Sequence, residues 1–156
     1  MPEPTNANTT SDSKNRLRKR LSANDLGIGG SHQAGILVPI PLAHFFPKLD
    51  EGELNPNIWI SIEHDGLRRW RWHFIHYNNK VVRDGTRNEY RLTGTVHAMR
   101  ALGCQVGSEI ELTRTGDHTY QVSVVKNLSS ESKTRDPRVV ILSTSGPWSS
   151  VSVRTL

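Results

Sequence analysis

Cysteine is almost absent from this chain, since Cys104 is the single one among 156 residues. One cysteine cannot form an intrachain disulfide. The chain also lacks the apolar segment near Met1 that would mark a secretory signal, and no run approaches the roughly 18 apolar residues of a membrane-spanning helix. We therefore expect an intracellular, cytoplasmic protein with no membrane partner.

Apolar periodicity is missing at the N-terminus. Residues 1–13 read MPEPTNANTTSDS, which predicts a disordered lead-in. Residues 14–156 are long enough for a single domain with its own core, which we expect although 35% of the chain is hydrophobic and the composition is otherwise polar. Within that domain, the Ser-rich, charged stretch at residues 127–138 predicts a long loop.

The net charge of +5 is unevenly distributed. Five basic residues and no acidic one lie between Lys14 and Arg20, and seven basic residues against two acidic ones lie between Arg68 and Arg91. A solvated basic face without a partner would explain a modest net charge. Segregation into two windows that also contain polar hydrogen-bonding residues favours a polyanionic partner, and nucleic acid is the most common one.

Alternation of apolar and polar residues predicts a mainly β fold. At residues 16–23, Leu17, Lys19 and Leu21 alternate with arginines, as in a half-buried strand with one basic face. The clearest hairpin is residues 108–126, where two alternating segments flank the turn TGDHT. Further strands are expected at residues 36–40, 57–64, 70–77, 86–94 and 139–142, and short helices at residues 41–49 and 96–103. About seven strands and two short helices indicate a small open barrel or pseudobarrel.

The patterns that could indicate catalysis or cofactor binding are weak. Glu131 and Lys133 belong to an E-x-K tripeptide of the kind that holds Mg²⁺ in nucleases, but they lie in the Ser-rich stretch instead of on the rigid strand that metal ligands prefer. His73 and His76 are three apart in a predicted strand, so they point to opposite faces and do not suit one metal ion. The sequence therefore predicts no catalytic residue, no cofactor and no metal site.

The stretch RDGTRNEYRLTG, residues 83–94, has a distinctive set of side chains. A strand here places Arg87, Glu89 and Arg91 on one face and Asn88 on the other. Arginine can donate two parallel hydrogen bonds to guanine O6 and N7, and glutamate can accept from cytosine N4, so the set suits G·C base pairs. The alternative is an intramolecular Arg–Glu–Arg ladder on the surface, which would add little stability.

The glycine-rich segment GIGGSHQAG, residues 27–35, presents His32 and Gln33 near its end. It lacks the Lys-Ser/Thr of a phosphate-binding P-loop. Two interpretations of this segment stay open: it is a flexible turn, or it is a loop whose backbone approaches a ligand closely.

Four motifs resemble the N-terminal DNA-recognition domain of EcoRII-type restriction endonucleases. They are KRLSANDLGIGGSHQAG at residues 19–35, ELNP at 53–56, YN at 77–78, and TRNE at 86–89 followed by Arg91. That family has the DNA-binding pseudobarrel fold shared with plant B-three transcription-factor domains, in which seven strands and two short helices form an open barrel and two arms grip the major groove. The resemblance implies an N-arm at residues 22–35 and a C-arm at residues 83–91.

The resemblance also implies a function. It is sequence-specific binding of double-stranded DNA at CCWGG, where W is A or T, with no catalysis and no cofactor in this chain. The parent protein would be a prokaryotic type II restriction endonuclease whose catalytic domain lies C-terminal to this chain and uses Mg²⁺. The alternatives are a free-standing pseudobarrel regulator or RNA-binding barrel, and a small Mg²⁺-dependent nuclease.

Carried over by motif, the site residues divide into three roles. The base readers are His32, Arg87, Asn88, Glu89 and Arg91. Support of the arm falls to Ser22, Asn24, Asp25 and Gln33, and binding of phosphates to Lys19, Arg20 and Arg83. The chain also departs from the family pattern, because Gly85 replaces a lysine, Tyr90 a basic residue and Leu37 a tyrosine. Each departure removes a polar or charged group from the arms or their surroundings.

Overall fold

The computed structural model describes residues 16–29, 35–125 and 139–153, and the structural statements that follow concern those ranges. Nine strands form one sheet in the order β2-β5-β4-β3-β7-β6-β1-β9-β8. The strands are β1 (Arg16–Arg20), β2 (Ile36–Val38), β3 (Asn57–His64), β4 (Arg68–Tyr77), β5 (Glu89–Thr93), β6 (Glu109–Arg114), β7 (Thr119–Val125), β8 (Val139–Ser145) and β9 (Trp148–Val153). β3 and β7 are parallel and the other neighbours antiparallel.

Three short helical segments accompany the sheet. They are the 3-10 helix η2 (Ile40–Phe45) and the α-helices α1 (Asn79–Val82) and α2 (Val96–Ala101). Gly103, just beyond α2, has a φ of 69°, the left-handed conformation that commonly ends a helix and that glycine adopts without steric cost. In the described residues, no helix is long and apolar enough to cross a membrane.

The inner face of the sheet is filled by one apolar cluster. Phe46, directly after η2, stacks on Phe74 of β4 with ring centroids 4.8 Å apart and lies 5.6 Å from the ring of Tyr120 in β7. The Tyr120 hydroxyl donates a hydrogen bond to the carbonyl of Phe45 at 2.8 Å, which satisfies a polar group that burial would otherwise penalise. η2 and the residue after it therefore pack into the core.

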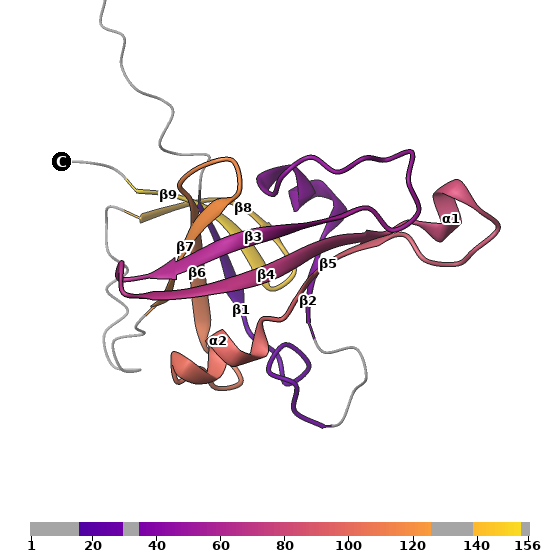
Figure 1. Ribbon diagram of the computed structural model, residues 1–156. Helices are drawn as coiled ribbons and strands as arrows, with labels where there is room; N and C mark the ends of the chain where they lie inside the picture. The colour runs from indigo at the N-terminus through magenta and orange to yellow at the C-terminus, as the bar shows by residue number, and fades with distance from the viewer. Residues whose placement is uncertain (1–15, 30–34, 126–138, 154–156) are drawn as a thin grey trace, which may run out of the picture.

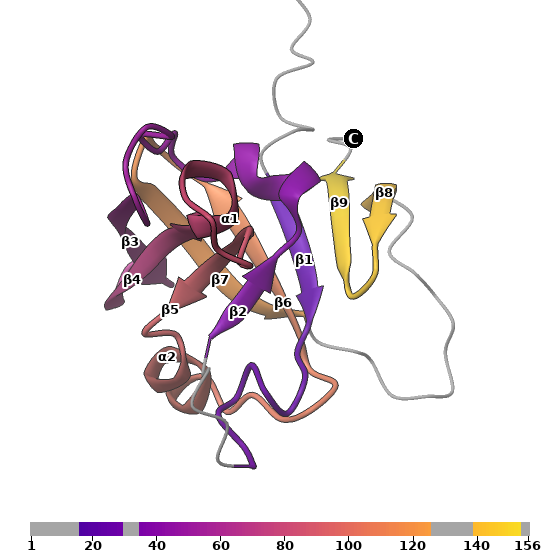
Figure 2. The ribbon, with the colours of Figure 1, turned by 90° about the vertical axis from the view of Figure 1, so that its right-hand side faces the viewer.

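The sheet curls into an open barrel (Figures 1 and 2). β2 is the first strand of the sheet order and β9 lies next to the last one. Even so, the indole Nε1 of Trp148 in β9 donates a hydrogen bond to the carbonyl oxygen of Leu37 in β2 at 3.1 Å. Trp148 therefore links the first strand of the order to the strand before its last one, through a side chain instead of a backbone ladder.

The predicted pseudobarrel is confirmed, with differences in detail. The described residues contain nine strands, where about seven were expected. β9 was not among the expected strand segments. The helix expected at residues 41–49 is the 3-10 helix η2, and α1 was not predicted. The expected lead-in at residues 1–13 and loop at residues 127–138 lie outside the described residues.

Two arms project from the barrel (Figure 1). The described part of the N-arm, residues 22–29, follows β1 and lies close to α2, since a Cβ on Gly27 would be 3.4 Å from Val96. The C-arm, residues 83–91, leads from α1 back into β5. In Figure 2, α1 and the N-arm lie at opposite ends of β2 and β5. The arrangement leaves β2 and β5 between two projecting segments.

Candidate nucleic-acid interface

The C-arm holds Arg87, Glu89 and Arg91 in one cluster, on one face as predicted. One oxygen of Glu89, Oε1, accepts hydrogen bonds from Nε of Arg87 and Nε of Arg91, each at 3.1 Å. The same oxygen forms an ion pair with NH2 of Arg87. The Arg87 guanidinium also lies 3.9 Å from the ring centroid of Tyr77 in β4. The intramolecular ladder is therefore present.

The ladder sets the charge of this surface. Partial burial alone would raise the pKa of Glu89, but its hydrogen bonds to Arg87 and Arg91 and their positive charges outweigh that effect and hold the pKa below its usual range. Glu89 is thus ionised at neutral pH, and the cluster carries one net positive charge. The Arg87 side chain keeps 37% of its surface exposed, whereas that of Arg91 keeps 11%. A guanidinium has five N–H donors, so Arg87 has donors left for a partner.

Asn88 lies on the opposite face of the C-arm. Its Oδ1 is 2.7 Å from Nε2 of His76, a buried residue of β4. The His76 ring stacks on Tyr90 with centroids 4.0 Å apart, and its Nδ1 is 2.9 Å from Oε2 of Glu51. Neither His76 nor Glu51 was among the predicted site residues. The available signal was His76 itself, a histidine on the apolar face of a predicted strand.

The C-arm is also fixed at its base by Asn79 of α1. The side-chain Oδ1 of Asn79 accepts a hydrogen bond from the backbone N–H of Arg87 at 2.7 Å. The backbone carbonyl of Asn79 accepts hydrogen bonds from the backbone N–H groups of Arg83 at 3.0 Å and Gly85 at 3.1 Å. A Cβ on Gly85 would lie 2.3 Å from Cγ of Asn79. Glycine at this position is therefore what lets the arm close onto α1. The Arg83 side chain, predicted to bind phosphate, is exposed.

The N-arm begins with a buried ion pair that corrects one prediction. Lys19 was expected to bind phosphate, but it is 4% exposed, and its Nζ forms an ion pair with Oδ2 of Asp25, which is 3% exposed. The same Asp25 oxygen accepts a hydrogen bond from the backbone N–H of Ser22 at 2.8 Å. In return, the Ser22 hydroxyl oxygen accepts one from the backbone N–H of Asp25 at 3.3 Å. Lys19 therefore holds the start of the arm and is not available to a phosphate.

Other residues of the first basic window are partly neutralised. Arg16 and Arg18 of β1 pair with Glu111 of β6, at 3.3 Å and 2.8 Å. Arg20 is exposed, as its predicted role requires. The carbonyl oxygen of Asn24 accepts a hydrogen bond from the backbone N–H of Gly27 at 3.1 Å, which closes a turn. His32 and Gln33 lie outside the described residues.

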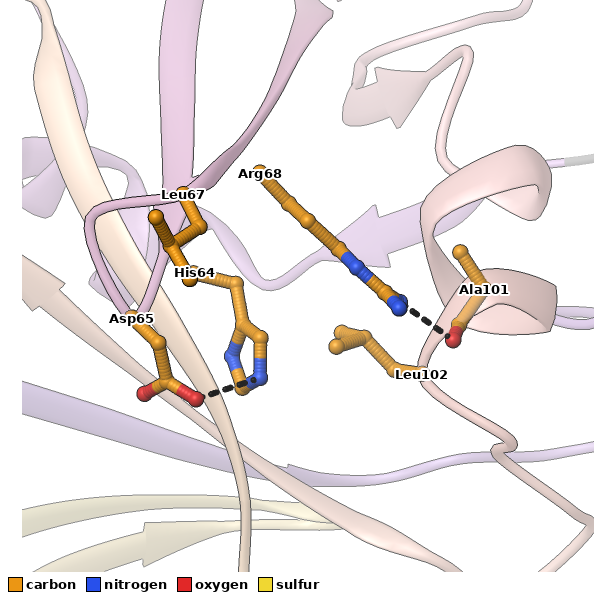
Figure 3. Close-up of a pocket in the computed structure, with 6 residues that line it drawn as sticks. All are labelled: His64, Asp65, Leu67, Arg68, Ala101 and Leu102. Carbon is orange, nitrogen blue, oxygen red and sulfur yellow. Dashed lines mark hydrogen bonds and ion pairs between the residues drawn. The ribbon is translucent and has the colours of Figure 1, made fainter.

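At the start of β4, the second basic window stabilises the β3–β4 hairpin instead of the arms. A surface hollow there is lined by His64, Asp65, Leu67, Arg68, Ala101 and Leu102 (Figure 3). NH1 of Arg68 donates to the carbonyl of Ala101 at 2.9 Å, and Nε2 of His64 lies 3.1 Å from Asp65. The Arg68 hydrogen bond ties the start of β4 to the end of α2, and the His64–Asp65 contact lies within the β3–β4 turn. In Figure 1 this turn and α1 lie at opposite ends of the β3–β4 hairpin.

No metal centre is found in the part of the chain that the structure describes, where no group of three or more potential metal-ligating residues lies together. His73 binds Asn57 through Nε2 at 2.7 Å, whereas His76 binds Glu51 and Asn88, so the two histidines do face opposite sides of β4. Glu131 and Lys133 of the E-x-K tripeptide lie outside the described residues.

Comparison with known proteins identifies relatives of this chain. The family model described as "Restriction endonuclease EcoRII, N-terminal" matches residues 10–129. The type II restriction enzyme EcoRII of Escherichia coli is 38% identical over 85 residues, which are 51% of this chain and 20% of that enzyme. The chain thus spans about a fifth of its curated relative. Among solved structures, the Arabidopsis FUS3–DNA complex matches with a TM-score of 0.52 and 22% identity, covering 70% of this chain and 94% of that one, a likeness of fold.

Proposed function

Because this chain belongs to the family of restriction endonuclease EcoRII N-terminal domains, we propose that it binds double-stranded DNA sequence-specifically between its two arms. The observation that carries the proposal is the hydrogen-bonded cluster of Arg87, Glu89 and Arg91 on an arm at one end of β2 and β5, with a second arm at the other end. Arabidopsis FUS3, whose structure was solved in complex with DNA, has a similar fold.

Binding proceeds in two physical steps. Exposed cations draw in the duplex by neutralising phosphates and releasing counterions, and Arg20 at the start of the N-arm and Arg83 at the C-arm are placed for this role. Arm side chains then test base edges in the major groove. Since Lys19 is held by Asp25, we assign it to support of the arm, together with Ser22.

The base readers we propose are His32, Arg87, Asn88, Glu89 and Arg91. The family resemblance implies the site CCWGG, whose outer pairs are all G·C. Arg87 keeps exposed donors that suit guanine O6 and N7. Glu89 holds both arginines in place and has a second carboxylate oxygen, Oε2, to offer to cytosine N4. Asn24, Asp25 and Gln33 support the arm.

We infer no chemistry in this chain. The relative it resembles is a restriction enzyme about five times the length of the matched part, so we propose that a catalytic domain follows this one in the parent protein and that Mg²⁺ belongs to that domain. The binding domain requires no cofactor in this proposal.

The proposal is tested by affinity for a duplex with CCWGG and for duplexes with one G·C pair exchanged, at two salt concentrations. A difference that persists at the higher salt supports direct reading of bases. Arg87→Ala should reduce discrimination at one G·C pair by about 1–3 kcal/mol, while Arg83→Ala should weaken all duplexes alike. The matched control is Arg69→Ala, at the end of the β3–β4 hairpin away from α1. It should change neither the discrimination nor the overall affinity. Equal affinity for all duplexes would refute sequence-specific binding.

A further inference from the structure

The aromatic ring of Tyr77 supports the guanidinium of Arg87. Tyr77 is the last residue of β4, is half-buried, and lies directly opposite Glu89 in the ladder between β4 and β5. Residues directly opposite each other in an antiparallel pair share one face of the sheet, so Tyr77 lies on the face of Glu89 and Arg87. The guanidinium carbon of Arg87 is 3.9 Å from the ring centroid of Tyr77. At this distance the negative face of the ring attracts the cation.

The hydrogen bonds of Arg87 leave one edge of its guanidinium for a ligand. Oε1 of Glu89 accepts from Nε of Arg87 at 3.1 Å and also from NH2, so the edge formed by these two nitrogens is occupied. The other edge consists of NH1 and NH2, which present two parallel N–H groups. Within the described residues, NH1 of Arg87 has no hydrogen-bond partner. The open edge matches the acceptors O6 and N7 of guanine.

Two hydrogen bonds along one edge do not fix the plane of a guanidinium. The group can still tilt about the line through Nε and NH2 of Arg87, and the open edge would tilt with it. A ring that lies 3.9 Å from the guanidinium carbon removes the space for that tilt on one side. Both hydrogen bonds to a guanine require the fork to lie near the plane of the base. The ring of Tyr77 therefore restricts the motion that would spoil the fork.

The barrel holds Tyr77 in place. The next residue, Asn78, is 0% exposed. Its Nδ2 donates a hydrogen bond to the carbonyl of Glu53 at 2.7 Å, and its Oδ1 accepts one from the backbone N–H of Asn55 at 2.8 Å. These bonds tie the end of β4 to the loop before β3. The surface beneath Arg87 is therefore part of the barrel and not of the C-arm.

We propose that Tyr77 is a positioning residue for base recognition, which orients the open edge of Arg87 toward a guanine in the major groove. This inference rests on the DNA-binding function proposed above. The C-arm supplies the side chain that contacts the base, and β4 supplies the surface that orients it. An arginine that is already oriented loses less side-chain freedom when DNA binds, so the contact with the correct base gains affinity.

The first test compares Tyr77→Leu and Tyr77→Phe by their discrimination between CCWGG and duplexes with one G·C pair exchanged. Tyr77→Leu removes the ring and should lower discrimination about two- to fivefold at the pair that Arg87→Ala affects, the loss expected for a cation–π contact at an exposed site. Tyr77→Phe keeps the ring and should retain discrimination. In the Arg87→Ala background, Tyr77→Leu should cause no further loss at that pair. An equal loss in Tyr77→Phe would assign the effect to the hydroxyl and overturn the proposal.

The matched control is Trp59→Leu on β3. The Trp59 side chain is also partly exposed, and the Arg71 guanidinium lies 4.9 Å from its ring centroid. Trp59→Leu thus removes a similar arginine–aromatic contact outside the two arms. It should leave discrimination unchanged at every pair. The same loss in Trp59→Leu and Tyr77→Leu would contradict a specific role for Tyr77.

The second test uses the free domain and does not depend on DNA. The ring current of Tyr77 shifts the proton NMR signal of the Arg87 Nε–H group, which is identified by its absence in Arg87→Ala. This signal should move in Tyr77→Leu and stay nearly in place in Tyr77→Phe. An unchanged signal in Tyr77→Leu would show that the ring does not lie against Arg87 in solution, and it would overturn the proposal.

The outcomes separate the two proposals. If the unmodified domain binds all duplexes equally, the proposed function itself fails. If it discriminates and Tyr77→Leu does so equally well, or weakens all duplexes alike, this inference alone fails. Should Tyr77→Leu not fold, pentafluorophenylalanine at position 77 keeps the shape of the ring and reverses the charge of its face. That domain should lose discrimination at the Arg87 pair, and unchanged discrimination would overturn the inference.

Discussion

Lys19→Met should destabilise the domain without changing the salt dependence of DNA binding. The side chains of Lys19 and Asp25 are each 5% exposed, so the substitution leaves the Asp25 carboxylate buried without its counter-ion. Removing one partner of a buried ion pair costs about 3–5 kcal/mol. With a urea dependence of about 2 kcal/mol/M, typical of small domains, the midpoint of urea unfolding should fall by about 2 M.

Two assays separate the structural role of Lys19 from a phosphate contact. Urea unfolding measures stability, and DNA affinity at several salt concentrations measures counterion release. Each phosphate contact adds about 0.9 to the slope of log affinity against log salt. The slope for Lys19→Met should equal that of the unmodified domain. Arg20→Ala, which changes the exposed neighbour, should lower the slope by about 0.9 and leave the urea midpoint unchanged.

The double variant Lys19→Met/Asp25→Leu is the control. It removes both charges with little change in volume, and such replacements are commonly neutral or stabilising. Stability should recover toward that of the unmodified domain, apart from the lost hydrogen bond from Ser22 to Asp25. The reasoning would be refuted by a Lys19→Met domain with an unchanged midpoint and a slope lowered by about 0.9, since Lys19 would then leave Asp25 for a phosphate.

Three further predictions concern the arm and the barrel. Gly85→Ala places a methyl group within 2.3 Å of Asn79 Cγ, so it should displace the C-arm, cost about 1–3 kcal/mol in urea unfolding and weaken specific DNA binding. The pKa of Glu89 is lower in the folded state than its unfolded value of 4.5. The stability that Glu89 contributes is therefore present above pH 4.5 and is lost as pH falls through the folded pKa. When the unfolding midpoint is measured at decreasing pH, it should fall less for Glu89→Gln than for the unmodified domain. Trp148→Phe removes the hydrogen bond to Leu37 and should lower stability by about 1 kcal/mol, measured by thermal unfolding.

Periodicity predicted which residues share a face, but not what they contact. In β1 it placed Lys19 on the same side as Leu17 and Leu21, and all three are buried. The error was to treat the charge of Lys19 as surface charge in spite of that side. A lysine on an apolar face requires a buried partner, and Asp25 lies six residues later in a turn whose geometry the sequence alone does not specify.

The contacts that support the C-arm could not be predicted from the sequence, for a different reason. The contact between His76 and Glu51 spans 25 residues, and that between Tyr90 and Glu51 spans 39. Such contacts depend on how the loop before β3 packs against β5, which local patterns do not encode. α1 has four residues, too few for a helical period to appear. The C-arm face of Arg87, Glu89 and Arg91, by contrast, follows from period two alone.

Two positions at which the resemblance implies cations have a common physical effect in this chain. Gly85, where it implies a lysine, lets Asn79 bind the backbone of Arg87. Tyr90, where it implies a basic residue, stacks on His76 and binds Glu51. Both residues thus take part in contacts that hold the C-arm in one conformation. A rigid arm pays less ordering entropy on binding, and it offers fewer cations to phosphates. The affinity of this domain should therefore depend less on salt, and more on base contacts, than that of a relative with both cations.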